Sequence, residues 1–82
     1  MQRDEMSEFL EPTQEELTRL QSDYDWLRTN YTTVKKDYAG MHVAVHNQTI
    51  VAAVNIGKMD DLREQLGRQN LDPRYVVVER IL

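Results

Sequence analysis

The sequence predicts one small α+β domain in the order α-β-β-α-β, with a long N-terminal helix and a short second helix packed on one face of a three-stranded sheet containing a β-hairpin. Three observations support this. A heptad pattern of apolar residues runs through the first half of the chain, two β-branched runs follow it, and a short amphipathic segment precedes a valine-rich end. With 82 residues and no cysteine, the chain must fold around one modest core without disulfides.

The first predicted element is a long helix from about Thr13 to about Ala39. Thr13 and Glu16 have the spacing of a capping box, and Gly40 supplies a left-handed stop. Between these signals apolar or aromatic residues recur in alternating steps of three and four, at Leu17, Leu20, Tyr24, Leu27, Tyr31, Val34 and Tyr38. A continuous helix would be roughly 40 Å long, more than so small a domain can cover. Either its first turns project as an arm or it breaks at QSDYDW, where Ser22 would cap a second helix; we expect one continuous helix.

Charge is unevenly distributed along the chain. Residues 1–25 hold eight acidic and two basic residues, a sum of minus six, whereas the remainder sums to plus two. Residues 1–12 show no sustained period and end at a proline, so we expect a flexible acidic leader and a single domain over residues 13–82. The acidic arm speaks against nucleic-acid binding and permits self-association or docking on a basic partner, although a solvated helix without a partner is the simpler interpretation.

A β-hairpin is predicted from the runs MHVAVHN and TIVAAV, which Asn47 and Gln48 separate. Asparagine tolerates positive φ more readily than glutamine does, so the turn type stays open. With a two-residue loop one face is wholly apolar and is expected to lie under the helices; it holds Met41, Val43, Val45, Ile50, Ala52 and Val54. The other face carries His42 and His46 and is expected to point to solvent.

The rest of the chain predicts a short helix and a last strand. The helix runs from about Met59 to about Gln69, Asn70 is its expected left-handed cap, and Pro73 prevents it from resuming before the strand RYVVVERIL. A right-handed crossover should place both helices on the apolar face of the sheet. We expect the first strand to be central, although the third strand could also lie beside the second.

The stretch WLRTNYTTVKKDYAGMHVAVHNQTIVAAV, followed by a short helix and LDPRYVVVERIL, resembles a family of small microbial proteins catalogued as domain of unknown function five-six-seven-eight. The resemblance covers about residue 25 to residue 82 and rests on Trp26, Tyr38, Gly40, Val43, Ala44, Val51, Asp72 and Pro73. The chain departs from the family at Asn47-Gln48, where a glycine turn is common, and at Ile56, where the family has glycine. The resemblance implies a structural role for most of these residues and no activity.

The two histidines do not have the spacing of a metal site. His42 and His46 are predicted on one strand, where residues four apart lie about 13 Å from each other. Two zinc ligands must each come within about 2.1 Å of the metal, so one ion cannot bridge them. No metal site and no cofactor are expected, and pH sensing is a weaker possibility.

No catalytic site is predicted, and the protein is not expected to be an enzyme. Ser7 lies in the leader and Ser22 in a helix, and neither belongs to a recognisable nucleophile arrangement. Asp60 and Asp61 are explained by the helix dipole. Gly57 and the lysine after it lack the remaining residues of a phosphate loop.

The predicted function is a protein-protein interaction module or homo-oligomer that uses the heptad-patterned acidic helix. Its expected interaction surface consists of Leu17, Leu20, Tyr24, Trp26 and Leu27. Trp26 lies off the seam, so it either covers the sheet edge or marks a partner surface. The alternative is a small-ligand or metal-binding module on the outer sheet face near His42 and His46. No apolar run is long enough for a membrane span and the N-terminus is too polar for a secretory signal, so a cytoplasmic protein is the default.

Overall fold

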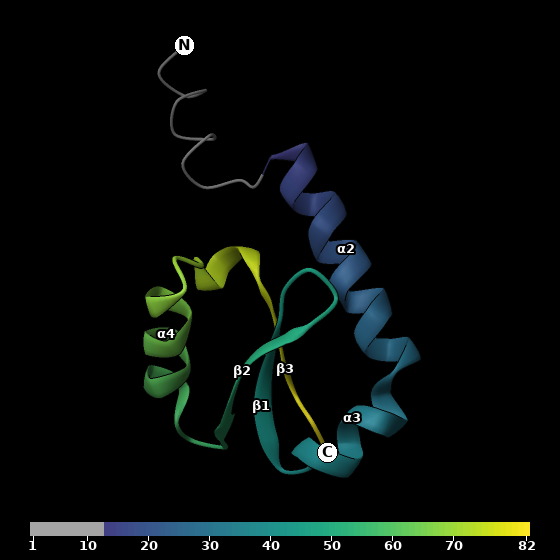
Figure 1. The fold of residues 1–82 in the computed structure, drawn as a ribbon, viewed down its shortest axis with the longest axis vertical. Helices are drawn as coiled ribbons and strands as arrows, with labels where there is room; N and C mark the ends of the chain where they lie inside the picture. Colours follow the sequence, from purple (N-terminus) through teal and green to yellow (C-terminus); the bar gives the residue numbers. More distant parts are fainter. Residues whose placement is uncertain (1–12) are drawn as a thin grey trace.

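The computed structural model describes residues 13–82, which form a three-stranded antiparallel sheet with helices on both of its faces (Figure 1). The elements are helix α2 (Gln14–Thr29), helix α3 (Tyr31–Tyr38), strand β1 (Met41–Val45), strand β2 (Ile50–Asn55), helix α4 (Met59–Arg68), the 3₁₀ turn η1 (Pro73–Tyr75) and strand β3 (Val77–Arg80). The strand order is β2-β1-β3, so the first strand is central, as expected. The α+β class and the hairpin are confirmed. The predicted leader, residues 1–12, lies outside the described residues.

Helix α2 begins where the sequence predicts, after Thr13. It ends at Thr29, where the sequence predicts no break. Thr13 Oγ1 accepts a hydrogen bond from the Glu16 amide at 3.1 Å, and Glu16 Oε1 accepts one from the Thr13 amide at 2.7 Å. The expectation of one continuous helix is wrong, because α2 ends at Thr29 and Asn30 leaves the helical region with φ −103° and ψ 14°. Asn30 Nδ2 donates to the carbonyl of Trp26 at 2.8 Å, which stabilises this end. The resulting change of direction keeps α3 against the sheet (Figure 1).

The hairpin has the predicted two-residue loop. The His46 amide donates to the carbonyl of Thr49 at 2.9 Å, and both central residues have positive φ, 54° at Asn47 and 57° at Gln48. Positive φ at both positions is the signature of a type I′ turn, whose twist matches that of the strands it joins. The turn chemistry that the sequence left open is therefore settled by the backbone.

A β-bulge displaces the strand register beyond the turn. Val45 pairs with Ile50 as predicted, but the next pair is Ala44 with Ala52, so Val51 is the extra residue. His42 consequently lies opposite Val54 rather than Ala53. The bulge moves Ala52 and Val54 to the face opposite Ile50, and both faces of the sheet carry apolar side chains.

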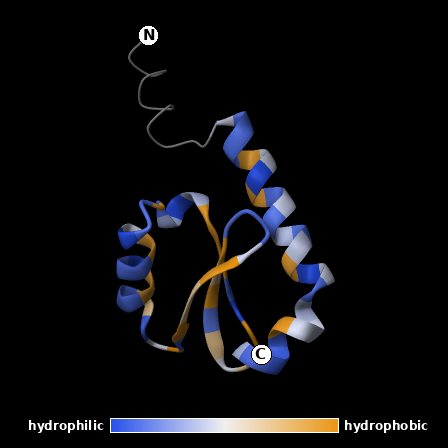
Figure 2. Ribbon diagram, in the orientation of Figure 1, coloured by the Kyte–Doolittle hydropathy of each residue, from blue (hydrophilic) through white to orange (hydrophobic). Residues whose placement is uncertain are grey.

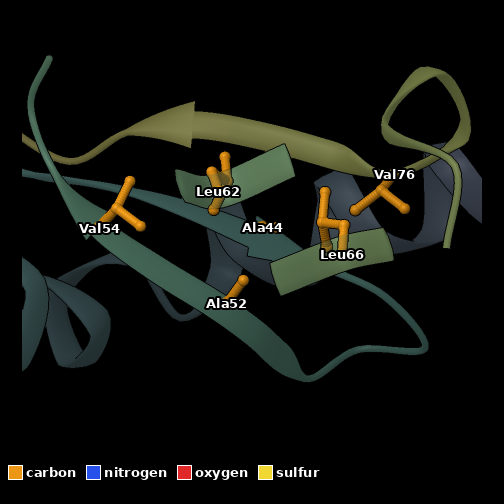
Figure 3. Close-up of a cluster of buried hydrophobic side chains, with 6 residues drawn as sticks. All are labelled: Ala44, Ala52, Val54, Leu62, Leu66 and Val76. Carbon is orange, nitrogen blue, oxygen red and sulfur yellow. The ribbon is translucent and has the colours of Figure 1, made fainter. Parts of the chain in front are cut away.

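The core consists of two clusters separated by the sheet, and the expectation that both helices pack on one face is wrong. One cluster lies between the sheet and α4 and contains Ala44, Ala52, Val54, Leu62, Leu66 and Val76 (Figure 3). The other lies between the sheet and α2–α3 and contains Leu27, Val34, Val43, Val45 and Ile81. Figure 2 shows the same arrangement, with hydrophobic residues on the strands and on the side of α4 that faces them.

The C-terminal third follows the prediction closely. Helix α4 spans Met59–Arg68, and Asn70 adopts the left-handed conformation with φ 61°. The last strand is shorter than predicted because η1 replaces its first residues. Among residues 13–82, no helix has the length and apolar content needed to cross a membrane.

Candidate interaction surface

The N-terminal half of α2 projects past the end of the sheet (Figure 1), and α2 carries two large hydrophobic side chains that are exposed. Leu17 is 47% exposed and Tyr24 is 41% exposed, while Leu20 between them is half-buried. Leu17 and Tyr24 are seven positions apart, which places them on the same side of the helix. The Arg28 guanidinium lies 5.9 Å from the centroid of the Tyr24 ring. We call Leu17, Leu20 and Tyr24 the α2 stripe.

The other two residues of the predicted interaction surface are less exposed than Leu17 and Tyr24. Leu27 is 2% exposed and is part of the cluster beneath α2 and α3, so it is not available to a partner. Trp26 is half-buried and packs against the same cluster, which favours its role as a cover for the sheet over that of a partner contact. The two halves of the heptad pattern therefore differ in burial. Residues of its C-terminal half pack in this chain's own core, whereas those of its N-terminal half lie outside the core.

A shallow groove of ≈ 670 Å³ runs along α2 beside the stripe. Its lining reaches from Leu17 past Trp26 to Gln48 in the hairpin turn, and Asp25 is the one charged residue in it. The groove therefore combines apolar walls with amide and hydroxyl groups, a composition suited to a polypeptide surface rather than to a highly charged ligand.

A buried carboxylate joins α2 to the hairpin turn, and the sequence reasoning missed it. Asp23 is 1% exposed, and among residues 13–82 it is the one charged residue that is buried. Its Oδ2 accepts from the Asn47 amide at 3.1 Å and its Oδ1 from the Gln48 amide at 2.8 Å. The Gln48 side chain donates to Ser22 Oγ at 2.9 Å. One signal could have found this contact: Asp23 precedes Leu27 by four residues and so lies on the same side of the helix.

The histidines do not lie on an open sheet face. His42 and Ala44 are on the face that α4 covers, and both His42 and His46 are half-buried. The Nδ1 atoms of both histidines are buried and have no hydrogen-bond partner among the described residues. Within residues 13–82, no three histidine, aspartate or glutamate side chains are grouped so that they could hold a metal ion. The open outer face on which the ligand-binding alternative depends is therefore not found.

A small hollow of ≈ 200 Å³ lies between α2, the end of β1 and η1, and His46 and Asp72 are in its lining. The Arg74 side chain donates to Asp72, with 2.7 Å between Arg74 Nη2 and Asp72 Oδ2. This hydrogen bond, together with the bond from the Arg74 amide, lowers the pKa of the Asp72 carboxyl below its usual value, and the same pair raises the pKa of Arg74. Both side chains are more than a third exposed, so the pair is a local cap of η1 rather than a buried ionic site.

The other residues considered for chemistry have local roles. Ser22 accepts from Gln48, and Asp60 pairs with Arg63 at 3.0 Å on the surface of α4. Ser7 lies outside the described residues. These contacts bring no nucleophile and base together.

Comparison with known proteins adds no relative: no family model, no curated protein and no solved structure matches the chain. The resemblance to domain of unknown function five-six-seven-eight therefore stays a prediction.

Proposed function

We propose that this chain is a protein-protein interaction module and that the α2 stripe is its contact with a partner protein. The observation that carries the proposal is the exposure of Leu17 and Tyr24 on one side of α2, whose N-terminal half projects past the sheet. The large hydrophobic residues exposed in residues 13–82 are Leu17, Tyr24, Ile56 and Leu82, so two of the four are concentrated there. Grouped apolar exposure beside a groove is typical of a binding surface, whereas scattered exposure is not.

The partner that fits best is a separate protein with an apolar groove and a basic rim. A coiled coil with a second copy would need a seam sustained over roughly three heptads or more. Here Leu27 and the seam residues after it are used by the chain's own core, which leaves only the α2 stripe. A short amphipathic helix suits docking into a groove, and the charge of minus six over residues 1–25 suits basic residues around it.

A crosslinking experiment tests this proposal. A photoreactive amino acid placed at position 17 of the full chain, in its native host, should capture one partner, which is then purified and titrated against wild type and Leu17→Asp. We expect Leu17→Asp to weaken binding at least about tenfold, the effect of losing roughly 1.4 kcal/mol at a central apolar contact. Thr33→Asp is the matched control, because it adds the same charge at an exposed residue of α3 that belongs neither to the α2 stripe nor to the groove beside it.

Equal binding of Leu17→Asp and wild type would refute the α2 stripe as the contact. The same conclusion follows if position 17 captures no protein while the control position 33 does.

A further inference from the structure

His46 lies where three elements meet. It follows β1 and lines a hollow of ≈ 200 Å³ together with residues of α2 and of the segment 70–76, which contains η1. Its amide donates to the carbonyl of Thr49 at 2.9 Å and closes the hairpin loop, whose next two amides donate to the Asp23 carboxylate on α2. The charge of this imidazole therefore acts on the contact between α2 and the hairpin turn.

One nitrogen of the His46 ring has no partner. Nδ1 is buried, and no group among residues 13–82 forms a hydrogen bond with it. A neutral imidazole carries its proton on one nitrogen and leaves the other as an acceptor, so Nδ1 can stay unprotonated while Nε2 holds the proton. Protonation adds a second N–H at Nδ1 together with a positive charge. A buried, unpaired donor costs more free energy on a charged group than on a neutral one, so the protonated form destabilises the fold.

The charged groups around the hollow do not compensate an imidazolium. The titratable and charged side chains that line it with His46 are Glu16, Arg19, Asp72 and Tyr75. Both carboxylates already accept hydrogen bonds, Glu16 from the Thr13 amide at 2.7 Å and Asp72 from the Arg74 side chain at 2.7 Å. The Arg19 guanidinium has the same charge as an imidazolium and repels it. Phenols are uncharged at neutral pH. The lining therefore offers a protonated His46 no carboxylate that lacks a donor of its own.

We propose that His46 is an acid-sensitive switch in this fold, neutral in the folded chain and destabilising the junction of α2, the hairpin turn and η1 when it is protonated. In an unfolded chain an imidazole is exposed to water and binds its proton at about pH 6.5. Where the unfolded state binds more protons than the folded state, stability rises with pH. Stability therefore falls as the pH is lowered from about 7.5 to about 5.5. The inference concerns the fold and not the α2 stripe, so it goes beyond the proposed function.

Urea denaturation of the full chain at about pH 7.5 and about pH 5.5 tests the switch. Over this interval we expect the unfolding constant of wild type to rise about fivefold to tenfold more than that of His46→Gln, because glutamine does not titrate. His42 is present in both proteins, so its contribution cancels. Carboxyl groups titrate at about pH 4, below the interval, and the hydrogen bond from Arg74 lowers the pKa of Asp72 further. An equal rise in the two proteins overturns the proposal.

A second variant isolates His46 without altering it. The chain has two histidines, so His42→Gln leaves His46 as its only imidazole. We expect the unfolding constant of this variant to rise about fivefold to tenfold between the same two pH values, since only His46 changes its charge there. An unfolding constant that stays the same overturns the proposal, and this result holds even if His46→Gln does not fold.

The position of the proton can be observed directly in wild type. In a long-range proton–nitrogen NMR spectrum at about pH 7.5, Nδ1 of His46 should resonate as a nitrogen without a proton and Nε2 as a nitrogen that carries one. A proton on Nδ1 at this pH overturns the proposal, because the buried nitrogen would then have an acceptor and protonation of the ring would leave no donor unpaired.

Discussion

At the residue scale, Asp23 explains how the hairpin tolerates glutamine in a left-handed conformation. A residue other than glycine or asparagine at positive φ costs roughly 1–2 kcal/mol. The Asp23 carboxylate accepts hydrogen bonds from both turn amides, and a hydrogen bond to a charged group contributes about 1.5–3 kcal/mol. The two bonds together exceed the cost at Gln48. The turn is therefore stabilised by α2 rather than by its own sequence.

Replacing Asp23 should destabilise the protein through this contact. We expect Asp23→Ala to lower the free energy of unfolding by about 2–3 kcal/mol, because two turn amides lose their acceptor. Urea denaturation measures the loss, and the amide resonances of Asn47 and Gln48 should be the most strongly shifted in the NMR spectrum. Asp25→Ala is the matched control, an exposed aspartate on the same helix. Equal losses for the two variants would show that the turn contact has no special role.

At the element scale, neighbouring residues determine where the helical region begins and ends. They do not determine whether it forms one helix or two. Gly40 has φ 80°, and its amide donates to the carbonyl of Ile81, so it both ends α3 and fixes the start of β1 against the last strand. Asn30 shows no comparable sequence signal, and the break there depends on the sheet that α3 must cover. Helix propensity over residues 14–38 alone would have continued the helix.

Two glycines should respond to alanine with opposite signs. A methyl group added at Gly40 or at Gly67 would meet no neighbouring atom within 4 Å, so packing does not decide the outcome. Gly40→Ala should lower stability by about 1–2 kcal/mol because of its positive φ. Gly67→Ala, inside α4, should raise it by roughly 0.5–1 kcal/mol because alanine is the better helix former. Thermal unfolding of both variants provides the measurement, and a destabilised Gly67→Ala would contradict the prediction.

At the scale of the whole molecule, one three-stranded sheet separates two small clusters and belongs to both. Neither cluster is large enough to stand alone, since a domain of this size is close to the lower limit for independent folding. Val43 and Ala44 are adjacent in β1, yet they belong to different clusters. The two sides should therefore unfold together.

Leu66→Ala tests this cooperativity from the α4 side. Leu66 is 0% exposed, and truncating a buried leucine costs about 2–5 kcal/mol. The chain has a single tryptophan, Trp26, which packs on the opposite cluster and reports on that side by fluorescence. We expect the fluorescence and circular dichroism transitions in urea to shift to the same lower midpoint. A fluorescence midpoint that stays at the wild-type value would show that the two sides unfold independently.

Signals between residues close in the sequence predict much of the fold. The capping box at Thr13, the stop at Gly40, the two-residue hairpin loop, helix α4 and the left-handed Asn70 all follow from residues within a few positions of each other. Three members of the candidate surface, Leu17, Leu20 and Tyr24, also follow from periodicity. Periodicity does not distinguish these exposed residues from the buried Leu27. The same apolar spacing occurs whether a helix packs on its own domain or on a partner protein.

Contacts between distant residues decided the rest. The carboxylate of Asp23 meets amides 24 and 25 positions away, the bulge at Val51 exists only in the pairing of β2 with β1, and the break at Asn30 depends on where the sheet lies. The bulge places Ala52 and Val54 on the face that α4 covers, while Ile50 stays on the other. Local propensities specify which elements form and where they end, whereas side-chain packing across the sheet specifies which faces they cover and which side of α2 remains exposed.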